Sequence, residues 1–212
     1  MKKIILSLAI VASLVACKSE KKEKVATKEA KKVEVNISEL NNVDTSVSVL
    51  NWKGTKPTGA HNGTVSLKSG GILLEEGKLK GGEFIVDMTS IKVLDIPADK
   101  KGNGKLVGHL TSADFFDVAV YPTSKFVITS VEDKGDKLHV TGNLQIKDVT
   151  KSITIPASIS TENGLTTFKS ENFNVNRADF NVKYGSKSFF DNLKDKFIDD
   201  MMELSFEVKT KA

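Results

Sequence analysis

The chain has 212 residues, of which 39% are hydrophobic and 27% charged, with a formal net charge of +4 and a single cysteine. This length and hydrophobic share fit one folded domain with a sizeable core, and one cysteine excludes an intramolecular disulfide. The first 35 residues carry five more positive than negative charges, so the remainder is close to neutral and shows no clustered basic patch. No nucleic-acid partner is therefore expected.

The N-terminal segment has the layout of an export signal. Lys2 and Lys3 precede an apolar run over residues 4–15, which is too short to cross a bilayer as a mature helix. We therefore predict that residues 1–16 are a signal peptide and that the protein is exported.

Cys17 follows that signal, and residues 14–17 (Leu-Val-Ala-Cys) are similar to the lipobox of bacterial lipoproteins. The resemblance implies that Cys17 is lipidated and that the protein is held in the bacterial cell envelope by a lipid anchor. Lys18 is not the aspartate associated with inner-membrane retention, which favours the outer membrane, facing the periplasm or the surface. The alternative is an ordinary signal peptide with an incidental cysteine.

Residues 17–35 are predicted to be the lipidated cysteine followed by a flexible charged tether. The segment consists almost wholly of Lys, Glu, Ala, Val, Ser and Thr and has no aromatic residue. A segment with so little to bury is typical of a solvated spacer. We therefore expect it to add nothing to the stability of the domain, residues 36–212.

The domain alternates apolar and polar residues with period two, as half-buried strands do. Turn signals at residues 69–71, 133–136 and 162–164 separate the runs and indicate an antiparallel meander. About eight strands with one or two short helices favour closure into an all-β barrel, because closure removes the sheet edges. The predicted strands cover residues 48–52, 63–68, 72–76, 79–90, 125–131, 138–146, 152–160, 165–173 and 202–208.

Residues 109–122 form a compact block unlike the strands on either side. Leu106 and Leu110 stand four apart, so a short helix leading in from Gly104 would carry both on one face, and Asp114 would end it. This block is expected to lie at an opening of the barrel.

Three phenylalanines, Phe115, Phe116 and Phe180, can either pack in the core or line a ligand cavity. We expect Phe180 to pack in the core and one of Phe115 and Phe116 to line a cavity.

Residues 188–193 start like a capping box and predict a second short helix.

Four spaced motifs, namely residues 109–122, Trp52 with residues 55–63, residues 81–90 and residues 176–180, resemble the YceI-like family. The resemblance implies a lipocalin-like barrel outside the cytoplasm that binds isoprenoids or other long-chain lipids. Asp148 and Asn181 replace glycines usual in the family, but both residue types tolerate left-handed backbone.

The family motifs and the inward faces of the strands together define a candidate site for an apolar ligand. No cofactor is expected. An eight-stranded barrel can also be filled by its own side chains, so a filled interaction or envelope-stress module is the alternative. The candidate ligand-binding residues are Trp52, Phe84, Met88, His109, Leu110, Phe115, Phe116, Val140, Leu144, Arg177 and Phe206.

Catalytic motifs are absent from the sequence, which favours a binding protein over an enzyme. There is no Gly-x-Ser-x-Gly elbow, no His-Glu-x-x-His pair and no phosphate-binding glycine loop. His61 and His109, with Asp114, would make at most an incomplete zinc site, so a metal-dependent enzyme is the third hypothesis. His139 alternates with polar residues and is expected to face solvent.

Arg177 is the only arginine among thirty lysines. Its planar fork suits bidentate binding of a carboxylate, for which Asp179, Asp114 and Asp117 are the candidates. An ion pair that fixes the corner at Phe180 is favoured over contact with a ligand head group.

The function predicted overall is storage or transport of a long-chain apolar ligand, such as an isoprenoid, isoprenoid quinone, fatty acid or amide.

Overall fold

The computed structural model describes residues 23–33, 40 and 42–211. Cys17 and the predicted signal peptide lie outside the described residues. No helix in the described part of the chain has the length and apolar composition needed to cross a bilayer.

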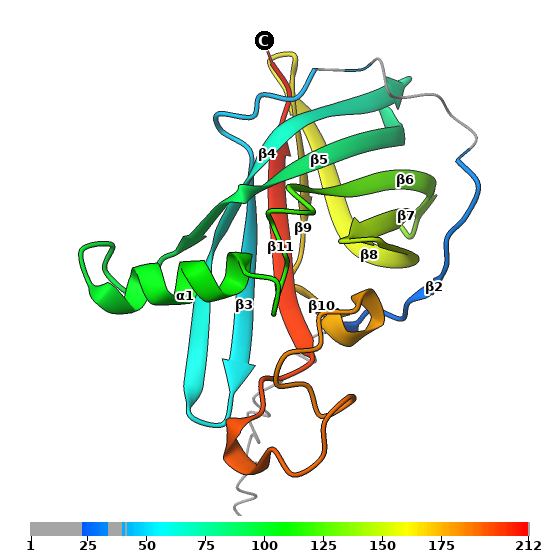
Figure 1. Cartoon of the computed structure of the whole chain (residues 1–212). Coiled ribbons are helices and arrows are strands. Elements are labelled where there is room, and N and C mark those ends of the chain that lie inside the picture. Colours follow the sequence, from blue (N-terminus) through cyan, green and yellow to red (C-terminus); the bar gives the residue numbers. More distant parts are fainter. Residues whose placement is uncertain (1–22, 34–39, 41, 212) are drawn as a thin grey trace, which may run out of the picture.

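Eight antiparallel strands close into a barrel, as predicted (Figure 1). From β3 to β9 each strand pairs with the next along the chain, and β11 pairs with both β9 and β3 and so closes the circuit. The barrel strands are β3 (Val49–Lys56), β4 (Gly59–Glu75), β5 (Lys78–Val93), β6 (Thr123–Asp133), β7 (Leu138–Ile146), β8 (Val149–Glu162), β9 (Leu165–Ser170) and β11 (Met201–Lys209).

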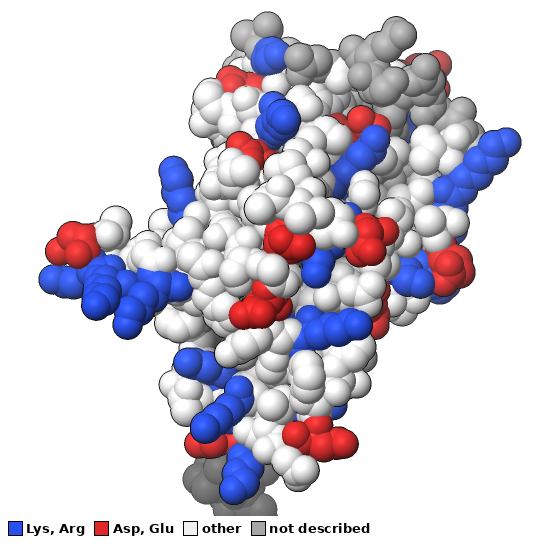
Figure 2. Space-filling model, in the orientation of Figure 1, with Lys and Arg blue, Asp and Glu red and all other residues white. Residues whose placement is uncertain are grey.

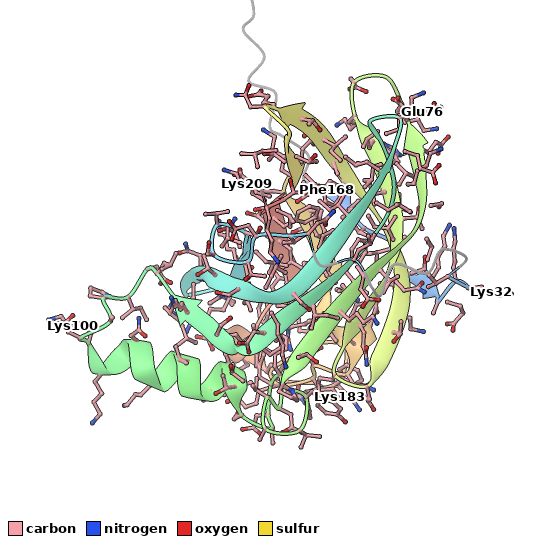
Figure 3. The ribbon with its side chains drawn as sticks, turned by 90° about the horizontal axis from the view of Figure 1, so that it is seen from above. Lys32, Glu76, Lys100, Phe168, Lys183 and Lys209 are labelled. Carbon is pink, nitrogen blue, oxygen red and sulfur yellow. The ribbon has the colours of Figure 1, made fainter. Side chains whose placement is uncertain are left out.

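Period-two alternation places the core inside the barrel. In β7, Val140 and Ile146 are buried, whereas His139 and Thr141, on either side of Val140, remain partly exposed. Phe168 of β9 is fully buried and lies within the ring of strands (Figure 3). The alternation read from the sequence therefore identifies the inner face.

β4 differs from the prediction, which was two strands joined by a turn at residues 69–71. It is continuous, with irregular register against β5 near Leu67. Gly71 does not form a turn but lets the chain at Leu40 approach the strand closely. A Cβ on Gly71 would lie 2.4 Å from the Cβ of Leu40. Asn42 next to it exchanges two hydrogen bonds with the backbone of Ile72.

One helix, α1 (Lys101–Thr111), packs beside β5. It begins before Gly104 and ends three residues before Asp114, which was expected to end it. The second helix predicted at residues 188–193 is wrong, since those residues form a turn followed by irregular backbone. Left-handed backbone at Asn192 and Lys194 ends any helical path there, and only the short η2 (Lys194–Lys196) follows.

Residues 23–33, here called the strap, run along the outside of the barrel (Figure 1). β1 (Glu23–Lys24) pairs in parallel with β10 (Phe173–Asn176), and β2 (Lys28–Glu29) pairs with β8. β9 pairs with β8, but its continuation β10 pairs with β11 and β1 instead. The strap therefore bridges the seam where β10 and β8 separate.

Side-chain contacts also hold the strap. Val25 is buried, and the Thr27 hydroxyl donates to Asp179 at 2.6 Å. The side-chain amide of Asn143, on the outer face of β7, exchanges two hydrogen bonds with the backbone of Lys31. The expectation of an undocked tether is thus wrong for residues 23–33, because free strand edges and one valine suffice to hold a charged segment.

Val25→Ala is expected to lower the free energy of unfolding by about 1–2 kcal/mol, because it removes methyl groups that are buried against the barrel. Val33→Ala is the matched control, since Val33 in the same segment is 38% exposed. Urea unfolding of the two variants measures the difference. Equal, negligible effects would show that the strap does not dock.

Candidate functional site

An internal cavity of about 150 Å³ lies inside the barrel, walled almost entirely by apolar side chains. Nine of the eleven residues predicted for the site line it, because strand alternation and the block after α1 bring them to the same space. These nine are Trp52, Phe84, Met88, Leu110, Phe115, Phe116, Leu144, Arg177 and Phe206.

Aromatic rings form a large part of the wall. Phe84 stacks on Phe168 with 5.9 Å between ring centroids, and Phe168 meets Phe206 at 4.9 Å. Phe115 and Phe116 meet edge to face at 5.1 Å, and both line the cavity, whereas only one was expected to do so. These offset and edge contacts hold the rings in fixed positions around the space.

His109 and Val140 are the two predicted residues that do not line the cavity. His109 packs behind the wall, with its ring edge-on to Phe115 at 5.7 Å and to Tyr184 at 4.5 Å. Val140 is fully buried in the core, inward as predicted but away from the open space. Alternation alone identifies the inner face of a strand but not the part of it that borders a void.

Arg177 lies at the cavity wall in η1 (Arg177–Phe180), with its side chain 1% exposed. Its guanidinium donates to the backbone carbonyls of Asp199, Val182 and Ile198 at 2.7–3.0 Å. The carboxylate near it is that of Asp200, at 3.3 Å. The three partners predicted from the sequence were therefore wrong.

The environment of Arg177 makes it a structural anchor. Burial lowers the pKa of the guanidinium, while the carboxylates of Asp200 and Asp199 raise it. The group also faces the ring of Phe115 at 5.3 Å. Beside it, Phe180 is fully buried as predicted, and Asn181 has the left-handed backbone expected of a glycine replacement. Arg177 thus joins η1 to the chain that enters β11.

Trp52 brings an unpaired donor to the cavity. Its indole Nε1 is buried and has no hydrogen-bond partner in the described part of the protein. The ring lies over Gly63, where a Cβ would stand 2.7 Å from Trp52 Cζ2. An unpaired buried N–H in apolar surroundings is unfavourable, so an acceptor on a bound molecule would be stabilised there.

Further wall residues were not predicted. Phe126 and Phe173 belong to strands whose alternation could have identified them. Ile198 and Asp199 precede β11 and carry no periodic signal. Lys53 and Asp199 lie near Arg177 in the wall, and β11 pairs Lys53 with Glu203 but Leu50 with Phe206. The fourth charged wall residue is Lys125 of β6, whose ammonium lies 2.9 Å from the carboxylate of Glu83. Three of the four charged wall residues therefore lie toward one end of the cavity, and the rings of Phe206, Phe168 and Phe84 lie toward the other.

The candidate metal residues are engaged elsewhere. His61 Nδ1 lies 2.8 Å from the carboxylate of Asp95, and His109 packs between aromatic rings. Within residues 23–33, 40 and 42–211, no group of three or more His, Cys, Asp or Glu side chains could hold a metal ion.

Comparison with known proteins gives one family and one fold. A family model described as a YceI-like domain matches residues 24–210. A UPF0312 protein of Pseudomonas putida is 34% identical over 102 residues, 48% of this chain and 50% of that protein. A protein YceI of Salmonella arizonae is 47% identical over 51 residues, 24% of this chain and 27% of that protein. The matches thus span half or less of these relatives.

Two solved structures share the barrel. Burkholderia cenocepacia BcnA superimposes with a TM-score of 0.64 at 20% identity, covering 80% of this chain and all of that one. A polyisoprenoid binding domain from Saccharophagus degradans, implicated in plant cell wall breakdown, gives 0.62 at 16% identity, covering 82% and 99%. At these identities the likeness establishes the fold.

Proposed function

The chain belongs to the YceI-like domain family, and on that premise we propose that it is a binding protein, not an enzyme, that encloses a long apolar chain for storage or transport. The observation that carries this proposal is the apolar cavity inside the closed barrel. Each CH₂ group removed from water contributes about 0.8 kcal/mol before the costs of ordering the chain. A polyisoprenoid or fatty chain fits that wall chemistry.

The distribution of polar groups in the wall favours one orientation of the ligand. Lys53, Asp199 and Arg177 lie toward one end, whereas Phe206 and, through Phe168, Phe84 lie toward the other. The remaining charged wall residue, Lys125, is neutralised by its ion pair with Glu83. The apolar tail therefore occupies the aromatic end and the polar head the charged end. Trp52 Nε1 donates to an oxygen of the head, such as the carbonyl of a quinone, acid or amide.

The expected location rests on the N-terminal sequence. An export signal followed by a lipobox-like cysteine supports a protein anchored in the bacterial envelope through Cys17, with Lys18 favouring the outer membrane. An envelope location gives such a barrel direct access to membrane lipids.

Delipidated protein titrated with fatty acids, fatty amides, isoprenoid alcohols and quinones, each in two chain lengths, is expected to bind with an affinity that depends on chain length. Trp52→Phe keeps a ring in the wall but removes the donor, so it should weaken oxygen-bearing ligands about fivefold and leave hydrocarbons unchanged. Binding by none of these ligands to a folded apo-protein would contradict the proposal and favour an interaction module.

A further inference from the structure

Residues 183–198, here called the lip, expose aromatic side chains to solvent. Tyr184, Phe189 and Phe190 are 44%, 42% and 49% exposed, whereas Phe168, Phe173 and Phe180 are all at most 4% exposed. The lip is the orange loop at the bottom of Figure 1, between η1 and β11. Two adjacent phenylalanines in water are unfavourable unless a partner covers them.

The lip holds these rings out on an ordered turn. Ser186 is fully buried, and its carbonyl accepts from the backbone N–H groups of Phe189 and Phe190 at 3.2 and 3.0 Å. The hydroxyl of Ser188 donates to Asp200, the partner of Arg177, at 2.6 Å. The exposed rings are thus fixed by the same anchor that forms part of the cavity wall.

Lysines are interleaved with the exposed rings. The lip carries four lysines against two aspartates, although the domain as a whole is close to neutral. Lys183 Nζ lies 4.9 Å from the ring centroid of Phe189, and Lys187 Nζ lies 3.4 Å from that of Phe197. Figure 2 shows basic side chains spaced around this lower end, with uncharged surface and fewer acidic side chains between them. Aromatic rings among basic groups match the chemistry of an anionic membrane surface.

The lip also forms part of the rim of the cavity. Its last residue, Ile198, lines the cavity. Tyr184 packs on His109, which packs on the cavity residue Phe115. A surface that covers the lip would therefore lie next to the charged end of the cavity.

We propose that the lip docks on an anionic lipid bilayer, with Phe189 and Phe190 at the level of the head groups and the lysines against lipid phosphates. Docking brings the rim of the cavity to the lipid phase, so an apolar ligand passes between membrane and barrel without crossing bulk water. The transfer step rests on the proposed function, but the docking itself does not.

The test uses residues 18–212, which retain every contact described above but lack Cys17. This protein is expected to co-sediment with vesicles of phosphatidylcholine and phosphatidylglycerol, more weakly with phosphatidylcholine alone, and less as salt increases. A double variant, Phe189→Ser with Phe190→Ser, should lower the partition coefficient about tenfold or more. Leu165→Ser is the matched control: Leu165 is 43% exposed at the far β8–β9 hairpin, and its variant should bind as the parent does.

Charge and ligand transfer are tested separately. Lys194→Gln with Lys196→Gln should reduce binding to anionic vesicles severalfold and flatten the salt dependence. Without vesicles, the phenylalanine variant should keep the parent affinity for ligand, but its loading from vesicles should be slower. If the parent binds no ligand yet docks through the phenylalanines, the docking stands and the proposed function falls.

Three results would overturn the docking proposal. The first is that the parent binds neither kind of vesicle. The second is that the parent and the phenylalanine variant bind vesicles equally while thermal unfolding shows both to be folded. The third is a dimer in solution that depends on Phe189 and Phe190. The last would identify a second copy of the chain as the occupant.

Discussion

Cys17→Ser is expected to move the protein from the membrane fraction to the soluble fraction. The proposed acyl groups on Cys17 supply the strong hydrophobic attachment, since stable anchoring requires more than one chain. Fractionation of envelopes after a high-salt wash measures the effect, with Ser19→Ala as a neighbouring control. Residual binding through the lip would be removed by salt, so salt-resistant membrane association of Cys17→Ser would contradict lipidation.

Leu144→Lys is expected to abolish ligand retention. Leu144 lies in the cavity wall, where an ammonium group would either occupy the space of the chain or remain desolvated beside it. Binding of a fluorescent fatty acid and extraction of co-purified lipid measure the loss. Leu144→Met conserves volume and should retain ligand.

Two further variants keep that test decisive. Val120→Lys places the same charge at a residue that is 63% exposed and should change nothing. If Leu144→Lys does not fold, Leu144→Phe narrows the cavity without a charge and should shift preference toward shorter chains. Ligand retention by folded Leu144→Lys would contradict binding in the cavity. Val140, fully buried away from the void, would test folding instead.

The barrel was predictable because alternation is local and repeated in every strand. Residues 138–146 match β7 along its full length, and residues 202–208 lie within β11. Glycines at residues 69–71 misled the prediction, because the same residue serves a turn and a close backbone approach. The strap was missed because hydrogen bonding to strand edges leaves no hydrophobic pattern in the sequence.

The candidate site was predictable only in part. Nine wall residues lie on elements with a period or a family motif, whereas Ile198 and Asp199 have neither. Arg177 was expected to pair with a carboxylate close in the sequence or in the block, but tertiary structure brings Asp200 to it. The cavity itself is a small difference between the barrel volume and the side chains that fill it, which no list of residues supplies.

The strap also limits how far the barrel can move from an acylated Cys17. Glu23, six residues after Cys17, is held in β1, so the chain between the two residues spans about 20 Å at most. A chain free to residue 35 would reach about three times as far. If Cys17 is acylated, such a short connection holds the lip at an effective concentration in the millimolar range relative to the membrane that carries the anchor. Even a millimolar affinity of the lip would then keep the barrel docked for much of the time, while each release remains fast.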